Sequence, residues 1–257
     1  MRIGACLSLS RLPLPKGALD YVELNLSRVA ALSSPELTEW QTKLREAGVT
    51  AESANGFFPA ELRLVGPERD PTAIRAYVRR AFDNAAALGI RLCVLGSGKA
   101  RRAGPELSPK TALPQFEETV AWVGDLAEAY DMTVAVEPLC AAETDLVNTV
   151  AEGAALCRRL AHPRVRLLAD LYHVTAAGEP LSVLTDNRDL LCHIHAAAPA
   201  TRALPQPNDG YDYAAFFAAL KAAGYDGRVS IESGLPRENA AAALTDSLHF
   251  LRRMAAK

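Results

Sequence analysis

The sequence lacks any apolar stretch long enough to cross a bilayer, and it has no surplus of either charge. Nowhere do about 18 or more apolar residues follow one another, which excludes a transmembrane helix. The 28 Lys and Arg residues face 30 Asp and Glu residues, so the formal net charge is −2. Proteins that bind nucleic acid through its phosphates carry a basic surplus. We therefore expect neither a membrane protein nor a nucleic-acid-binding protein.

Cysteine patterns typical of secreted domains are also missing. The 5 cysteines are odd in number and include no CxxC pair, which favours a reduced compartment over a disulfide framework. The start, Met1 to Leu7, has one charge, a very short apolar run and no signal-peptide cleavage pattern. We expect a cytoplasmic protein.

Short apolar segments alternate with longer helical stretches along all 257 residues, with no linker between them. Each apolar segment reads as a buried strand. The eight predicted strands are Ile3–Leu9, Tyr21–Leu26, Thr50–Ala54, Arg91–Leu95, Met132–Glu137, Val165–Asp170, Leu190–Ala196 and Arg228–Glu232. We expect one domain covering residues 1–257.

The segments between these strands carry helix start and stop signals. One predicted helix begins at Ser34-Pro35-Glu36 and ends before Gly48, and the next begins at Asp70-Pro71 and ends before Gly89. The others are Pro114–Tyr130, Val150–Leu160, Tyr213–Ala223 and Glu238–Met254. Eight strand–helix units in about 250 residues predict a (β/α)8 TIM barrel, a single α/β domain.

Nucleotide-binding fingerprints are absent, which argues against an open doubly wound sheet. No GxGxxG follows the first predicted strand. The Gly96-Ser97-Gly98-Lys99 segment lacks the upstream glycine of a phosphate-binding loop, and Ala100 stands where that motif needs Ser or Thr.

Four successive predicted strands end in a carboxylate or an imidazole. The residues are Glu137, Asp170, His195 and Glu232. The carboxyl ends of the strands of a (β/α)8 barrel share one rim, where the active site lies. Any one of these acids alone would more often be a helix N-cap or a solvated loop charge, but four successive strand ends with a carboxylate or an imidazole indicate a shared site.

Three carboxylates and one imidazole on one rim predict a divalent metal site. Such ligands favour Mn²⁺, Mg²⁺ or Co²⁺. Zn²⁺ is a less favoured alternative, because zinc prefers Cys and His. His193 and His195 lie two residues apart on one strand face, so either is a candidate ligand. We favour His195, which lies nearer the rim, and expect His193 one layer deeper.

Two loops offer further side chains whose roles the sequence leaves open. Phe57 and Phe58 follow the third predicted strand and either line the pocket or pack on a neighbouring loop. Lys99, Arg101 and Arg102 follow the fourth strand. We favour a mobile, solvated basic loop there over a receptor for a substrate phosphate or carboxylate.

Several of these motifs together resemble the xylose isomerase-like superfamily, and within it the sugar (phosphate) isomerase/epimerase branch with the ketose 3-epimerases and hydroxypyruvate isomerases. The resemblance is strongest from about Met132 to Glu232. Its motifs are Ala135-Val136-Glu137-Pro138-Leu139, Glu143-Thr144, Val147-Asn148-Thr149, Ala169-Asp170-Leu171-Tyr172-His173, His193-Ile194-His195 and Ser230-Ile231-Glu232.

This resemblance implies an isomerase or epimerase of a small sugar, sugar phosphate or hydroxy-keto acid. It implies one divalent metal ion on Glu137, Asp170, His195 and Glu232, and substrate contacts from Glu143, His173 and Arg202. Glu137 and Glu232 would also be the two catalytic acid/base groups, which move a proton through a metal-stabilised enediolate. Related barrels often pair, so a homo-oligomer is compatible with the resemblance.

Three other functions fit parts of the same pattern. A metal-dependent dehydratase of a cyclic polyol or keto-inositol begins with the same proton removal and needs an acid for the leaving hydroxyl, for which His173 is available. A non-catalytic sugar-binding barrel is less favoured, because all four metal-site residues are present. DNA repair of the endonuclease IV type requires more histidines than these 5 and a basic face, which a net charge of −2 does not supply.

Overall fold

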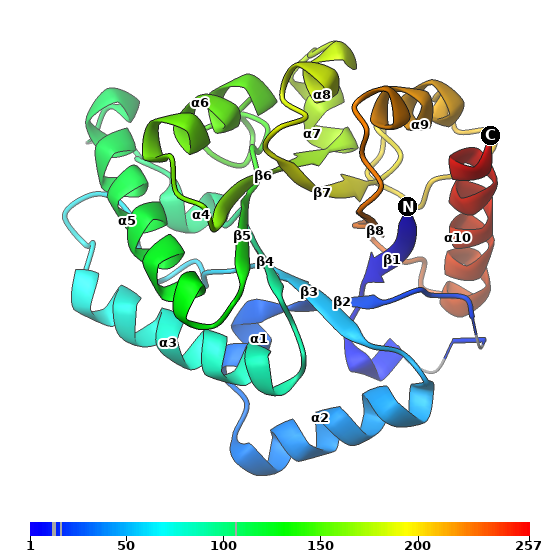
Figure 1. Ribbon diagram of the computed structural model, residues 1–257, viewed down its shortest axis with the longest axis horizontal. Helices are drawn as coiled ribbons and strands as arrows, with labels where there is room; N and C mark the ends of the chain where they lie inside the picture. Colours follow the sequence, from blue (N-terminus) through cyan, green and yellow to red (C-terminus); the bar gives the residue numbers. More distant parts are fainter. Residues whose placement is uncertain (12–13, 16, 106) are drawn as a thin grey trace.

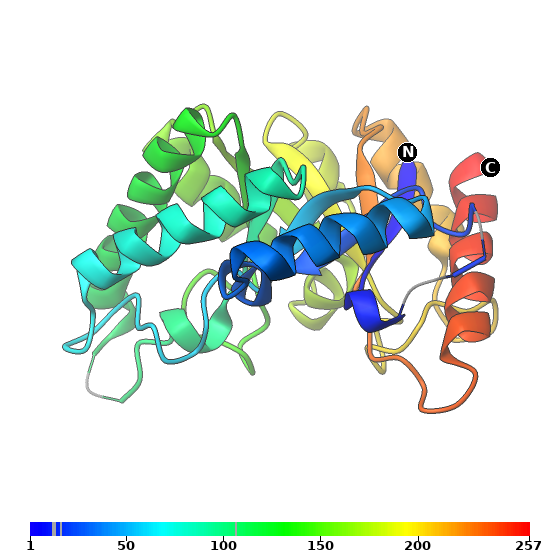
Figure 2. The same ribbon diagram turned by 90° about the horizontal axis from the view of Figure 1, so that it is seen from below.

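Eight parallel strands pair in chain order and close into a barrel, because the last strand pairs with the first. The computed structural model describes residues 1–11, 14–15, 17–105 and 107–257. Figure 1 shows the strands at the centre and the helices around them. The two termini lie on the same side of the molecule in this view and in Figure 2, as the pairing of the first strand with the eighth requires. The predicted (β/α)8 barrel is confirmed.

Each predicted strand has a counterpart in the barrel. The strands are β1 (Arg2–Cys6), β2 (Val22–Asn25), β3 (Ala51–Asn55), β4 (Leu92–Leu95), β5 (Thr133–Val136), β6 (Val165–Asp170), β7 (Leu191–Ala196) and β8 (Arg228–Ile231). The largest difference is at β1, which ends three residues before Leu9. Leu7 and Leu9 are buried and so continue the apolar pattern, but the chain has already turned into a short 3-10 helix, Leu9–Arg11.

The helices lie outside the strands. They are α1 (Leu26–Ala30), α2 (Ser34–Ala47), α3 (Pro71–Ala87), α4 (Gly98–Arg101), α5 (Pro109–Ala129), α6 (Val150–Leu160), α7 (Leu171–Ala176), α8 (Ser182–Asp186), α9 (Tyr213–Ala222) and α10 (Ala240–Ala256). The six predicted from the sequence are present, and four short helices, which begin at Leu26, Gly98, Leu171 and Ser182, were not predicted. In α3, the Asp70 side chain accepts the amide hydrogens of Thr72 and Ala73. Gly48 ends α2 with a φ of 64°, in the left-handed region that favours glycine.

One helix begins earlier than predicted. α5 starts at Pro109 and not at Pro114, because the Ser108 hydroxyl caps the amide of Thr111 and Pro109 takes the first helical position. Within the described part of the chain, no helix is both long and apolar enough to cross a membrane.

The barrel interior has an apolar part on β4 to β6 and a polar part on β2, β3, β7 and β8. The main apolar core lies between strands and helices, while Leu92, Val94, Ala135 and Leu168 form a separate small cluster. Polar residues on the strands are fully buried as well: Glu23, Ser53, His193, His195 and Ser230. Barrels of this kind are normally filled by branched apolar side chains. Because buried polar residues are costly in such a core, we expect the functional site to lie where they gather.

Candidate active site

The four predicted metal-site residues meet at the carboxyl rim of the barrel. Glu137 directly follows β5, Asp170 ends β6, His195 lies near the end of β7 and Glu232 directly follows β8. One ligand atom from each lies within 4.8 Å of the others. The rule that parallel strands deliver their ends to one rim thus brings together residues as far apart in the chain as 137 and 232.

The chemistry of this cluster fits a cation. Oδ1 of Asp170 accepts the amide hydrogen of Tyr172 at 2.9 Å, but Oδ2 is buried with no hydrogen-bond partner among the described residues. Burial, and then the charges of Glu232 and Glu137, raise the pKa of Asp170 to about 8. Three crowded carboxylates and an unpartnered buried oxygen are the donor set that Mn²⁺, Mg²⁺ or Co²⁺ prefers.

The two glutamates of the cluster have unequal surroundings. Glu232 accepts hydrogen bonds from Asn55 Nδ2 at 2.6 Å and from Arg202 Nη2 at 3.0 Å. Burial alone would raise the pKa of Glu232, but His195, Arg202 and Asn55 outweigh it and lower the pKa to about 2. For Glu137, burial and the charge of Glu232 raise the pKa above its ordinary value. In the metal-free cluster, Glu232 is therefore the ionised partner and Glu137 the one that more readily holds a proton.

His195 is held from both sides by carboxylates. Its Nδ1 lies 3.1 Å from Glu137 Oε1 and 3.6 Å from Glu232 Oε2, and its Nε2 lies 2.9 Å from Glu23 Oε1. Burial alone would lower the pKa of His195, but Glu23 and then Glu232 outweigh it and raise the pKa well above the ordinary value. His193 is buried beneath, 2.7 Å from Glu23, in the deeper layer where it was expected.

Sequence reasoning missed Glu23 and Asn55. Glu23 is fully buried in the middle of β2, and Asn55 ends β3. The available signal was a lone acid inside the predicted strand Tyr21–Leu26, where Asn25 is the other polar residue apart from the Tyr21 hydroxyl. Burial alone would raise the pKa of Glu23, but His195 and His193 outweigh it and hold the pKa well below the ordinary value.

The three residues expected to contact substrate surround the cluster. Arg202 Nη1 donates to Glu143 while Nη2 donates to Glu232, and the guanidinium lies 4.9 Å from the centre of the Tyr172 ring. His173 Nδ1 accepts the amide hydrogen of Cys140 at 3.0 Å, so the neutral ring carries its hydrogen on Nε2.

The free side of His173 faces the cluster. Its Nε2 lies 3.7 Å from Asp170 Oδ2 and has no hydrogen-bond partner in the described part of the chain. Burial, with a smaller effect of Arg202, lowers the pKa of His173 to about 3. This side chain is thus a neutral hydrogen-bond donor aimed at the site.

A cavity of about 360 Å³ opens beside Glu232. Its walls come from the ends of β1, β2, β3 and β8 and from helices α1 and α2, and they are Cys6, Leu7, Ser8, Asn25, Arg28, Trp40, Asn55, Glu232 and Ser233. Pockets of about 300 Å³ and more hold small-molecule ligands. The cavity is large enough for a small substrate with one end at the cluster.

The basic residues after β4 were expected to form either a mobile, solvated loop or a receptor for a substrate anion, and their contacts differ from both. Arg101 belongs to α4 and is fully buried; its Nη2 donates to the carbonyls of Glu137 at 2.9 Å and Val147 at 3.3 Å. Arg102 Nη2 donates to the Ala142 carbonyl at 2.6 Å, and Lys99 is exposed. The expectation of a mobile solvated loop is therefore wrong for Arg101, because the loop after β5 offers it buried carbonyls.

The two phenylalanines after β3 pack on neighbouring elements. Phe57 is fully buried with its ring centroid 5.8 Å from that of Phe82, and Phe58 lies 5.5 Å from Tyr77. The Tyr77 hydroxyl also donates to the Phe57 carbonyl at 2.5 Å. The rings therefore pack, as one expectation had it, but their partners lie on helix α3 and not on a neighbouring loop.

The fold and the rim together define a (β/α)8 barrel with a carboxylate–imidazole cluster at its carboxyl end. The family model for xylose isomerase-like TIM barrels matches residues 17–254, and the chain belongs to this family. The superfamily resemblance seen in the sequence is thereby confirmed.

Relatives with assigned activities are sugar epimerases. The chain is 35% identical over 121 residues to the 3-dehydro-D-guloside 4-epimerase of Escherichia coli K12. The aligned residues cover 46% of this chain and 45% of that protein. It is 26% identical over 203 residues to the ketose 3-epimerase of Arthrobacter globiformis, 75% of this chain and 66% of that protein. These matches thus span about half to two thirds of the relatives' lengths.

A solved structure, the D-psicose 3-epimerase of Clostridium cellulolyticum H10, shares the fold. Its TM-score is 0.85 at 19% identity, over 99% of both chains.

Proposed function

We propose that the protein is a divalent-metal-dependent isomerase or epimerase of a small sugar, sugar phosphate or hydroxy-keto acid. The observation that carries this proposal is that Glu137 and Glu232 belong to one cluster of candidate metal ligands but have different surroundings, which shift their pKa values in opposite directions. The sugar epimerases among the relatives support it. Glu137, Asp170, His195 and Glu232 would hold Mn²⁺, Mg²⁺ or Co²⁺. Once bound, such an ion supplies Lewis acidity that stabilises the negative charge of an enediolate.

The protein's own groups then divide the proton transfer. Glu232, ionised and held by Asn55 and Arg202, takes the proton from the substrate carbon next to the carbonyl. Glu137 holds a proton more readily and returns one from its own side. Return to the same carbon is epimerisation, and return to the adjacent carbon is isomerisation.

The neighbouring residues orient the substrate. The Nε2 hydrogen of His173 has no partner in the described part of the chain and is available to a substrate oxygen. Arg202 and Glu143 bind each other beside the cluster and offer further donors and acceptors to hydroxyl groups. The 360 Å³ cavity beside Glu232 receives the rest of the molecule.

Solvent-deuterium exchange tests this function directly. The purified protein is incubated in D₂O with a small panel of ketoses and hydroxy-keto acids in the presence of Mn²⁺, Mg²⁺ or Co²⁺. We expect one compound to exchange its carbon-bound proton, and Glu137→Gln and Glu232→Gln each to abolish that exchange. Glu52→Gln is the matched control: this carboxylate pairs with Arg2 and Arg228 at the amino ends of β1 and β8, away from the cluster. Undiminished exchange in either rim variant would refute the assignment.

A dehydratase of a cyclic polyol or keto-inositol is the second candidate. The observation in its favour is the Nε2 hydrogen of His173, which has no partner among the described residues, faces the cluster and is able to donate a hydrogen bond to a leaving hydroxyl. Mass spectrometry of the product separates the two reactions, because a dehydratase product is lighter by one water and an epimer is not.

A further inference from the structure

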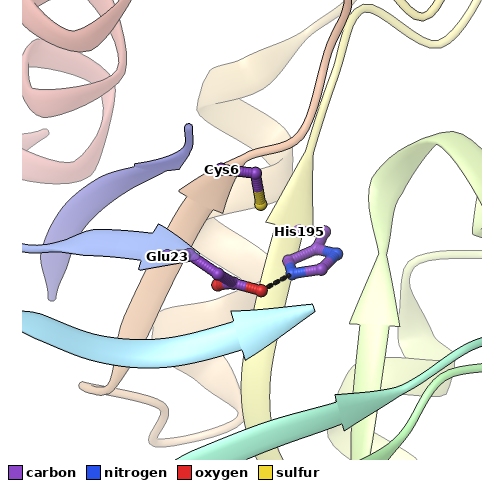
Figure 3. A group of neighbouring side chains, drawn as sticks. All are labelled: Cys6, Glu23 and His195. Carbon is purple, nitrogen blue, oxygen red and sulfur yellow. Dashed lines mark hydrogen bonds and ion pairs between the residues drawn. The ribbon is translucent and has the colours of Figure 1, made fainter. Parts of the chain in front are cut away.

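A buried carboxylate that the proposed reaction does not use lies directly beneath the cluster. Glu23 is fully buried, and its Oε1 lies 2.9 Å from Nε2 of His195. Figure 3 shows Glu23 reaching from β2 toward His195 on β7, with the sulfur of Cys6 directed toward the pair. The other nitrogen of the same ring, Nδ1, lies 3.1 Å from Glu137 Oε1. The His195 ring therefore sits between Glu23 and the candidate metal ligands.

The contacts of Glu23 decide where the hydrogen of His195 lies. An ionised carboxylate only accepts hydrogen bonds. Oε2 of Glu23 accepts the hydroxyl hydrogens of Ser53 at 2.7 Å and Ser230 at 2.6 Å, and His193 Nε2 lies 2.7 Å away. Among the described residues, Oε1 has His195 as its one hydrogen-bond partner. A neutral His195 consequently carries its hydrogen on Nε2 and presents the lone pair of Nδ1 to the rim.

Glu23 is itself held in one position. Its partners come from strands on both sides: Ser53 on β3, Ser230 on β8 and the two histidines on β7. The Tyr21 hydroxyl lies 2.7 Å from Ser230 Oγ and donates to it, because the only hydrogen of Ser230 goes to Glu23. A carboxylate fixed on both oxygens fixes the ring that donates to it.

We propose that Glu23 is a positioning residue of the cation site: it accepts the Nε2 hydrogen of His195 and so fixes the tautomer whose Nδ1 lone pair faces the other ligands. This inference rests on the proposed metal site but not on the identity of the substrate. Histidines that bind metals commonly donate their second N–H to a carboxylate, and loss of that partner lowers metal affinity about 10- to 100-fold.

A role in packing alone makes a different prediction. Replacing a buried ionic group by a neutral one of similar shape often leaves folding stability unchanged or raises it. Packing does not depend on which ring nitrogen of His195 carries the hydrogen, whereas metal binding does. The tautomer and the metal affinity therefore separate the two roles.

The test is Glu23→Gln, measured by Mn²⁺ titration calorimetry on metal-free protein and by ¹⁵N NMR of the histidine rings. The glutamine amide is able to donate to Nε2 and so favours the opposite tautomer. We expect Mn²⁺ affinity to fall about 10- to 100-fold while the circular dichroism spectrum stays that of the wild type. The control Glu52→Gln removes a carboxylate of the same barrel at its opposite end and should leave the affinity within about twofold of wild type.

NMR keeps the inference open to refutation even if Glu23→Gln fails to fold. Spectra of metal-free wild-type protein are recorded above the pH at which His195 loses its second proton. A ring with its hydrogen on Nε2 supports the inference, and a ring with its hydrogen on Nδ1 overturns it. A folded Glu23→Gln protein with unchanged Mn²⁺ affinity also overturns it. If the wild type binds no Mn²⁺ at all, the proposed function fails, and the tautomer still decides whether Glu23 orients His195.

Discussion

Replacing Arg101 by methionine should weaken the fold around the active site without changing anion recognition. The guanidinium is fully buried and donates to the carbonyls of Glu137 and Val147, while Phe116 lies beneath it at 5.2 Å. Burial lowers the pKa of Arg101 to about 10, so the group remains charged at neutral pH. Methionine retains much of the apolar stem but leaves both carbonyls without this donor.

The size of the effect follows from these contacts. A hydrogen bond from a charged donor contributes about 1.5–3 kcal/mol, and the two bonds at 2.9 and 3.3 Å give a gross loss of about 3–6 kcal/mol. Removing a buried charge offsets part of that, because the charge no longer has to be desolvated. We expect a net loss of about 2–4 kcal/mol in unfolding free energy, which lowers Tm by roughly 4–16 °C in a chain of this size.

Urea unfolding and thermal scans measure the loss, and Arg102→Met is the matched control. Arg102 is exposed and donates to one carbonyl, of Ala142, so its replacement should cost less than about 1 kcal/mol. Inhibition by inorganic phosphate is measured in parallel. Wild-type stability of Arg101→Met, combined with a selective loss of phosphate inhibition, would show that Arg101 is an anion receptor and that the structural role assigned to it is wrong.

Three further predictions concern the rim. Arg202→Ala should raise KM at least about tenfold while Mn²⁺ affinity measured by calorimetry stays near wild type, because Arg202, which pairs with Glu143 and Glu232, is proposed to contact the substrate and not the metal ion. An unchanged KM would contradict this role. Asn55→Ala removes the 2.6 Å hydrogen bond to Glu232 and should raise the pKa of that carboxylate, so the acid limb of the kcat/KM profile moves to higher pH; an unmoved limb would count against Glu232 as the base. Metal-free protein should lose stability as pH rises from about 6.5 to 8, because Asp170, with its pKa raised to about 8, holds a proton in the folded state that the unfolded chain has already lost. Below about pH 6.5 the lowered pKa of His173 acts in the opposite direction and offsets this decline. His195 acts in the same direction: its raised pKa stabilises the fold below about pH 6.5, and this contribution is lost at higher pH. Urea titrations in EDTA should show the decline and saturating Mn²⁺ should reduce it; a stability that rises over this range would refute the reasoning.

The barrel and its rim cluster were predictable because both depend on local rules. Eight apolar runs separated by helix signals predict the strands, and the rule that parallel strands share one rim brings Glu137, Asp170, His195 and Glu232 together. Neither step requires knowledge of how side chains pack across the barrel.

Glu23, Asn55 and Arg101 escaped prediction because their roles depend on contacts between distant strands and loops. Glu23 meets His195 only after the barrel has closed, and the register of β2 against β3 shifts just at Val22/Glu23. The Glu137 and Val147 carbonyls that accept hydrogen bonds from Arg101 belong to the loop after β5, some 40 residues further along the chain. A single strand pattern contains no information about such partners.

The polar residues inside the barrel divide between its two halves in a way that bears on assembly. All four candidate metal ligands come from β5 to β8, whereas Glu23 and Asn55, which hold two of them in place, come from β2 and β3. A folding intermediate with only the second half formed would possess every ligand but not the partners that orient them. Tight cation capture should thus be among the last events of folding, and the rate at which the protein gains Mn²⁺ affinity would report when the two halves join.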